Sequence, residues 1–170
     1  MTLEMAQAPE LGDLRGIRLS VVRRAADMLV LHFGSIKPHW SGRGTVGDMA
    51  LHVQCPWRLQ DSSRVLTGKE DLHDFAGGGA EPEGWDYEQG SSRQDLALDR
   101  IFGDRDPVLG WSVSSDKFLV KSVDASPFGD IDITFSGGCR LQVFPVATVL
   151  ESWRLFIPDS DGPHLVFPAE

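Results

Sequence analysis

Alternation of apolar and polar residues runs through most of this chain and predicts β-strands. Residues 28–33 place Leu29, Leu31 and Phe33 on one face of a strand and His32 on the other. Pro56 lies within a second alternating run, where it would interrupt the backbone ladder, so we expect a bulge or an edge strand there. The predicted strands span 17–23, 28–33, 49–59, 64–66, 118–123, 130–135, 140–144, 152–157 and 164–167.

Two parts of the chain carry the same pattern, which predicts an internal repeat. Ile17, Ser20, Val21, Leu29, Leu31 and Phe33 have the order and spacing of Leu119, Ser122, Val123, Ile131, Ile133 and Phe135. Each set leads to a Leu-x-Val and then to Trp-Arg-Leu, at 57–59 and at 153–155. We expect one domain, 1–170, with a pseudo-repeat of 17–66 and 118–167. The predicted fold is mainly β (α+β minor), a sandwich or partly open barrel of two pseudo-symmetric β units with one connecting helix.

The connection between the two units, residues 69–110, has a different composition. Its glycines at 77–79 and the stretch 82–90 predict a loop. Ser92 and Asp95 have the spacing of a capping box, and the apolar residues after them end at Gly103. We therefore expect a helix of about three turns.

The negative charge of the chain is concentrated in this connection. The net charge is −9, and residues 70–106 contain eleven acidic and three basic residues. Phosphate binding requires clustered Lys and Arg, so direct nucleic-acid binding is disfavoured. Aromatic residues within an acidic surface suit a basic protein partner, whereas a merely solvated loop is the alternative. The candidate partner-binding residues are Glu81, Glu83, Trp85, Asp86, Tyr87 and Glu88.

Composition indicates a cytoplasmic protein of a bacterium. No apolar stretch is long enough to span a membrane, and the N-terminus lacks the features of a secretory signal. Cys55 and Cys139 are too few for a disulfide framework, and buried free thiols are expected. The chain has no asparagine and twelve arginines against four lysines, as a GC-rich bacterial genome would encode.

Known catalytic and metal-binding motifs give no support for an enzyme. The G-x-G-x-x-G at 42–47 lacks the strand before it and the helix after it that a nucleotide fingerprint requires, so it predicts a hairpin loop. His32 and His52 point outward from strands that would be neighbours, while Cys55 points inward. We interpret them as surface histidines and predict no metal, no cofactor and no catalytic residue.

The two Trp-Arg pairs admit two interpretations. Trp57, Arg58, Trp153 and Arg154 would line a ligand pocket between the units, where each arginine would grip an anion. Alternatively, each tryptophan anchors its half of the core and each arginine pairs locally. Duplication preserves symmetric packing, which favours the structural interpretation.

Part of the C-terminal unit resembles known proteins. Residues 130–138, 141–145 and 151–156, with the sequences DIDITFSGG, LQVFP and ESWRLF, are similar to a signature of small uncharacterised bacterial proteins. Some of these resemble immunity proteins of toxin systems. The resemblance implies a small β-rich protein with a binding role.

The leading hypothesis is accordingly a non-enzymatic protein-binding module, immunity-like in its sharpest form, whose acidic segment blocks a basic partner. A small-ligand or anion-binding protein, or an enzyme with a cleft between the units, is the second hypothesis. A structural homodimer that pairs through an exposed sheet edge is the third.

Overall fold

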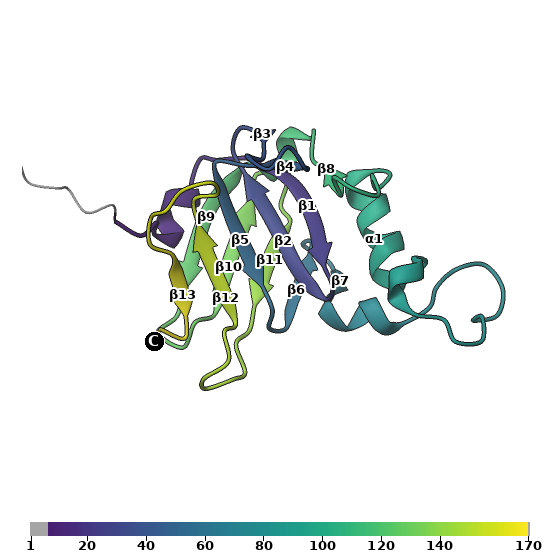
Figure 1. Cartoon of the computed structure of the whole chain (residues 1–170). Helices are drawn as coiled ribbons and strands as arrows, with labels where there is room; N and C mark the ends of the chain where they lie inside the picture. Colours follow the sequence, from purple (N-terminus) through teal and green to yellow (C-terminus); the bar gives the residue numbers. More distant parts are fainter. Residues whose placement is uncertain (1–6, 170) are drawn as a thin grey trace, which may run out of the picture.

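The structure is a computed structural model that describes residues 7–169 as two antiparallel sheets packed face to face (Figure 1). In spatial order the larger sheet contains β13 (Leu165–Phe167), β12 (Trp153–Phe156), β5 (Met49–Val53), β2 (Met28–Phe33), β1 (Leu19–Ala25) and β8 (Trp111–Ser112). The smaller sheet contains β7 (Val65–Gly68), β6 (Trp57–Gln60), β11 (Arg140–Val143), β10 (Ile131–Phe135) and β9 (Val120–Ala125). The prediction of a mainly β fold is confirmed, and the architecture is a sandwich rather than a barrel.

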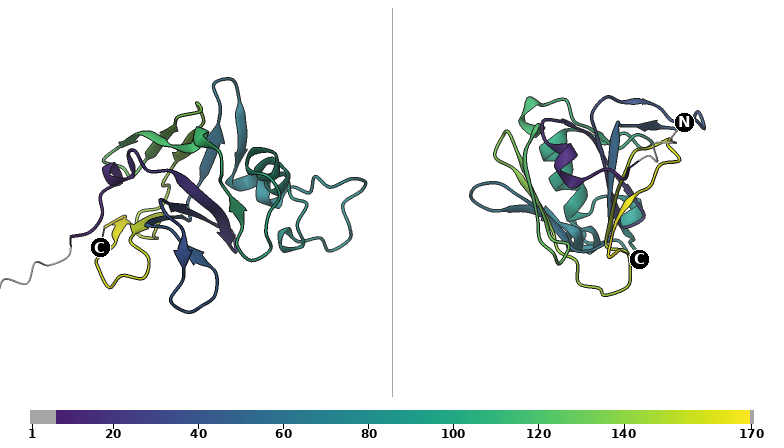
Figure 2. Two further views of the ribbon diagram at one scale, coloured as in Figure 1. Left: turned by 90° about the horizontal axis from the view of Figure 1, so that it is seen from above. Right: turned by 90° about the vertical axis from the view of Figure 1, so that its left-hand side faces the viewer.

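Short elements complete the fold. A two-stranded hairpin of β3 (Lys37–Pro38) and β4 (Thr45–Val46) stands out from the larger sheet (Figure 2). Within 7–169 there is one α-helix, α1 (Arg93–Phe102). The 3-10 turns are η1 (Leu11–Leu14), η2 (Lys69–His73), η3 (Tyr87–Gln89) and η4 (Asp116–Phe118). None of the described helices is both long and apolar enough to cross a membrane.

The chain changes sheets at Pro56, where the sequence predicted a continuous strand. The run 49–59 divides into β5 in the larger sheet and β6 in the smaller one. Pro56 has no N–H to give to a ladder, so pairing ends before it and resumes in the other layer. The expected bulge or edge position is therefore corrected to a crossing between layers. The prediction that Val53 and Trp57 point inward is confirmed, because both side chains are buried.

The second half of the chain follows the same path with the layers exchanged. β1, β2 and β5 lie side by side in the larger sheet before β6 and β7 cross, and β9, β10 and β11 lie side by side in the smaller sheet before β12 and β13 cross back. The registers correspond, since Trp57 is opposite Val143 and Trp153 is opposite Val53. A duplicated unit related by a pseudo-two-fold axis would produce this topology, which supports the repeat as a proposal.

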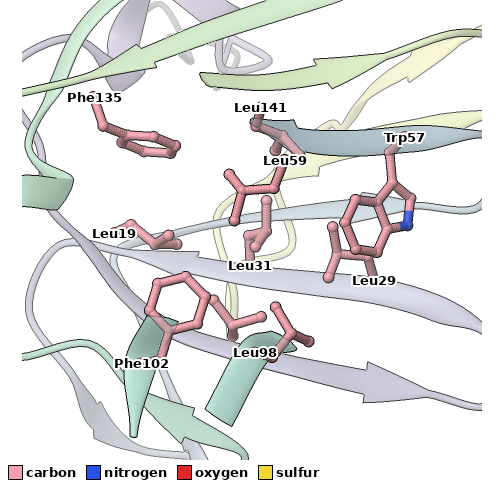
Figure 3. Close-up of a pocket in the computed structure, with 10 residues that line it drawn as sticks. Leu19, Leu29, Leu31, Trp57, Leu59, Leu98, Phe102, Phe135 and Leu141 are labelled. Carbon is pink, nitrogen blue, oxygen red and sulfur yellow. The ribbon is translucent and has the colours of Figure 1, made fainter. Parts of the chain in front are cut away.

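The apolar core fills the space between the sheets, and α1 covers the side where β7 and β8 lie. Leu98 and Phe102 of α1 point toward Leu31, Leu59 and Trp57 around a cavity of about 20 Å³ (Figure 3). This volume is close to the space that one water molecule needs, and an entirely apolar lining leaves such a cavity dry. The cavity therefore belongs to the packing of the core.

Helix α1 begins as the sequence predicts. The Ser92 hydroxyl accepts a hydrogen bond from the Asp95 N–H at 3.0 Å, and the Asp95 carboxylate accepts one from the Ser92 N–H at 3.2 Å. The same carboxylate lies 2.7 Å from the Arg24 guanidinium. The cap thus also anchors the helix to β1, which could not be read from the local pattern.

Candidate functional site

The outer face of the larger sheet carries an unusual row of side chains. Arg154, His52, Val30 and Arg23 are successive cross-strand neighbours on β12, β5, β2 and β1. Their neighbours along each strand point into the core, so this row faces away from the core. His32 follows on the same face of β2, two residues from Val30. Alternation therefore places two histidines and two arginines on one surface.

The β3–β4 hairpin folds over this surface. The Gly47 N–H donates to His32 Nδ1 at 3.1 Å, and the Arg23 guanidinium donates to the Thr45 carbonyl oxygen. A Cβ at position 47 would lie 2.5 Å from the Phe33 carbonyl oxygen, so only glycine permits so close an approach. The G-x-G-x-x-G motif is thus part of a hairpin, as predicted from its context.

A second loop, 157–164, holds the hairpin from the other side. His39 Nε2 lies 3.2 Å from Asp159 Oδ1, and the Trp40 N–H donates to Asp159 Oδ2 at 3.2 Å. One carboxylate thereby joins the hairpin to the loop. Between the hairpin, the loop and the sheet lies a pocket of about 400 Å³, here called the histidine pocket. Its ionisable lining consists of Arg23, Arg24, Arg43, His32, His39, His52 and Asp159.

The histidine pocket is basic, although the protein is acidic. Three of the chain's five histidines line it, and His164 lines the pocket beside it. Its one carboxylate, Asp159, is already engaged by His39 and the Trp40 N–H. Although the net charge of the chain is −9, guanidinium and imidazole side chains are therefore concentrated around the histidine pocket.

Arg23 is the least compensated of these groups. Within residues 7–169 its guanidinium forms no ion pair, and its Nε is buried without an acceptor. Burial lowers the pKa of Arg23. Arg24 differs, because its guanidinium points to the inner side and pairs with Asp95. Nε of Arg24 is also buried without an acceptor, so the two adjacent arginines differ in that only Arg24 has a carboxylate partner among the described residues.

His32 and His52 are neutral bases in this setting. Burial, with a smaller effect of the Arg23 charge, lowers the pKa of His32 to about 4. Burial and the Arg154 charge lower the pKa of His52 to about 4 as well. Since Nδ1 of His32 accepts a hydrogen bond, its proton is on Nε2. The prediction of surface histidines is wrong for His32, which is 5% exposed, because the hairpin covers it.

Metal ligands do not converge in the described part of the chain. No group of three or more His, Cys, Asp or Glu side chains there has a geometry that would hold an ion. Cys55 is in the core, on the opposite side of the larger sheet from His52. Cys55 and Cys139 are both free thiols, and burial raises the pKa of Cys55 to about 11.

The Trp-Arg pairs do not meet in one pocket. Trp57 and Trp153 are both buried in the core, and Trp153 Nε1 donates to the Gly129 carbonyl oxygen at 2.8 Å. Arg58 is on the outer face of the smaller sheet, where it donates to Gln142 at 2.8 Å. Arg154 is on the outer face of the larger sheet and pairs with Glu151 at 2.6 Å. The two arginines are therefore on opposite faces of the sandwich.

The acidic segment extends beyond α1, away from the sandwich (Figure 1). Its aromatic rings contact one another or nearby rings. The ring centroids of Phe75 and Trp85 are 5.3 Å apart in an edge-to-face contact, and those of Tyr87 and His73 are 5.4 Å apart. Glu81, Glu83 and Glu88 are exposed. The structure thus brings the predicted acidic and aromatic residues together in one projecting loop.

No protein-family model, no curated protein and no solved structure matches this chain. The geometry of its own residues is therefore the basis for assigning a function. Sequence alternation alone had placed His32 and His52 on one outward face. The sequence predicted a hairpin loop at 42–47 but not that it covers this face, because that placement depends on contacts with distant residues such as His32 and Arg23.

Proposed function

We propose that this protein binds a small anion in the histidine pocket. The observation that carries the proposal is the half-buried guanidinium of Arg23, which among residues 7–169 has no carboxylate partner and no acceptor for its Nε. A buried charge without a counter-charge is costly, and an anionic ligand would remove that cost. Guanidinium groups bind phosphate and carboxylate through paired charge-assisted hydrogen bonds.

The surrounding residues support this use of Arg23. Its donation to the Thr45 carbonyl oxygen holds the guanidinium under the hairpin. Arg43 adds a second positive charge from the hairpin, and within 7–169 it has no ion pair either. His52 lines the same pocket and can take up a proton when an anion arrives. The proposed function is of the kind given by the second hypothesis from the sequence, with Arg23 in place of Arg58 and Arg154 as the anion anchor.

The change Arg23→Gln tests the proposal. Inorganic phosphate or pyrophosphate at one hundred times its Kd is expected to stabilise the wild type by about 2.7 kcal/mol, which is roughly 5–10 °C in Tm. Loss of a charge-assisted bond should weaken binding by roughly 10- to 100-fold in the variant. Calorimetric titration and thermal unfolding measure the two effects.

Arg58→Gln is the matched control, since it removes a guanidinium from the opposite face of the sandwich and should leave anion affinity unchanged. Arg43→Gln changes an exposed residue of the hairpin and should weaken binding without an effect on folding. Equal anion affinity in the wild type, Arg23→Gln and Arg43→Gln would contradict the proposal. So would a wild type that responds to no phosphate, sulfate or carboxylate.

A second function is favoured by the projecting acidic loop. We propose that Glu81, Glu83, Asp86 and Glu88 attract a basic protein, with Trp85 and Tyr87 as contact residues. Within residues 7–169 none of these four carboxylates has an ion-pair partner, so their charges are free to act on another molecule. In its sharpest form this is an immunity-like protein that blocks a basic enzyme such as a nuclease.

Neutralising the loop tests this second function. A variant with E81Q, E83Q, D86N and E88Q should lose a basic partner that the wild type captures from host extract at low salt and releases at high salt. D116N with D124N removes exposed charges elsewhere and should retain the partner. Mass spectrometry identifies the captured proteins. Capture that is identical for all three proteins would rule the loop out as the interface.

A further inference from the structure

A second pocket of about 510 Å³ adjoins the histidine pocket and shares His39, Phe156 and Asp159 with it. Its other lining residues include Trp40 and His164. The two pockets therefore lie side by side along these three residues. One pocket is rich in positive groups, and the other pocket is rich in aromatic rings.

Trp40 lines this second pocket and is far more exposed than the core tryptophans. Its side chain is 80% exposed, whereas Trp57, Trp111 and Trp153 are all buried. Its backbone N–H donates to Asp159 Oδ2, which anchors the main chain at this point, and its ring centroid lies 5.3 Å from that of the His39 ring. A tryptophan that is exposed to water beside one neighbouring ring provides a large flat surface for a further aromatic group.

A second pair of rings belongs to the same pocket. Phe156 and His164 are stacked, with ring centroids 4.8 Å apart and an angle of 26° between their planes. Arg154 Nη1 lies 3.1 Å from His164 Nδ1 and fixes that ring. Phe156 also makes an edge contact with the ring of His52, with ring centroids 4.8 Å apart. Both residues line the histidine pocket. The aromatic surface therefore continues to the place where the anion would bind.

We infer that the anion bound by this protein is attached to a flat unsaturated ring, as in nucleotides and aryl phosphates. This inference rests on the proposed function of the histidine pocket. The anionic group occupies the space beside Arg23 and His52, and the ring contacts Trp40 and the Phe156–His164 pair. Stacking of a base on an aromatic side chain is tolerant of the identity of the base, so the aromatic pocket selects a class of ligand.

The test compares ligands that share the anion and differ in the ring. Phenyl phosphate and adenosine monophosphate are expected to bind roughly 5- to 100-fold more tightly than glycerol phosphate or inorganic phosphate. They should also quench the fluorescence of Trp40. The change Trp40→Ala should reduce the affinity for the ring-bearing ligands to that for inorganic phosphate and leave phosphate binding unchanged. Trp40→Phe should retain part of the preference when binding is measured by calorimetry.

The outcomes separate this inference from the proposal on which it rests. Phosphate binding that depends on Arg23, with no gain from a ring and no effect of Trp40→Ala, would overturn the inference and leave the anion site in place. Failure of every anion to bind would overturn both. Phe128→Ala is the matched control, because Phe128 is 78% exposed in the β9–β10 turn and should not affect ligand affinity.

Discussion

Replacing Asp95 by asparagine is expected to lower the free energy of unfolding by about 3–5 kcal/mol, because it leaves the Arg24 charge without a partner. The two side chains are 8% and 5% exposed, and their charged atoms are 2.7 Å apart. Arg105 is 3.7 Å from the same carboxylate and would not replace it. Equilibrium unfolding in urea measures the change.

Two further variants identify the cause. Asparagine retains an oxygen for the Ser92 N–H, so the capping contact is largely preserved, whereas Ser92→Ala removes the cap alone and should cost about 1 kcal/mol. Adding Arg24→Met to the Asp95→Asn protein removes the unpaired charge and should restore part of the lost stability. A loss below 1 kcal/mol in Asp95→Asn would show that Arg24 does not depend on this partner.

Acidification from pH 7 to pH 4.5 is expected to lower the stability of the wild type by about 2–3 kcal/mol through His32 alone. The pKa of His32 is about 4 in the folded protein and 6.5 in its ordinary state, chiefly because of burial. Between these values the unfolded chain binds a proton that the folded protein does not bind. Unfolding then takes up a proton, so the contribution is complete above pH 6.5 and is lost as the pH falls toward 4.

The change His32→Gln isolates this contribution. Glutamine can accept the Gly47 N–H hydrogen bond, as His32 Nδ1 does, and it does not titrate. The difference in unfolding free energy between wild type and variant should therefore change with pH by about 2–3 kcal/mol, while the effects of carboxylate groups are common to both. Parallel pH profiles for the two proteins would contradict a buried neutral His32. The pKa of His52 is also lowered to about 4, so His52 adds a loss of stability of the same sign in both proteins.

The two halves of the sandwich differ in charge where they correspond in position. Arg23 is opposite Val30 on the outer face of the larger sheet, and Asp124 is opposite Asp132 in the smaller sheet. Strand pairing thus matches Arg23 with Asp124, whereas the sequence alignment, which matched Val21 with Val123, is one residue out of register on this strand. His52 corresponds to Gln142 in the same comparison. With the repeat as proposed, β1 and β2 carry an arginine and a valine where β9 and β10 carry two aspartates. This difference explains why the proposed anion site is on the larger sheet only.

The helix and most of the strands could be predicted because their causes are local. Alternation defined β2 at its observed bounds, and Ser92 with Asp95 defined the start of α1. Alternation also predicted that Trp57 faces inward, and it is buried, whereas the burial of Trp153 was only one of two interpretations. Strand β8 was missed, because only two residues, Trp111 and Ser112, pair there.

The sequence by itself therefore determined the strands, their inner and outer faces, the helix cap and the acidic segment, since each depends on residues a few positions apart. The tertiary structure decided which sheet each strand joins, and so it placed Arg58 and Arg154 on opposite faces. It also decided that a hairpin covers His32 and that, in the part of the chain that the structure describes, Arg24 has a carboxylate partner while Arg23 has none. Burial and charge compensation depend on groups brought together from distant parts of the chain, and for that reason the proposed site is visible only in the folded protein.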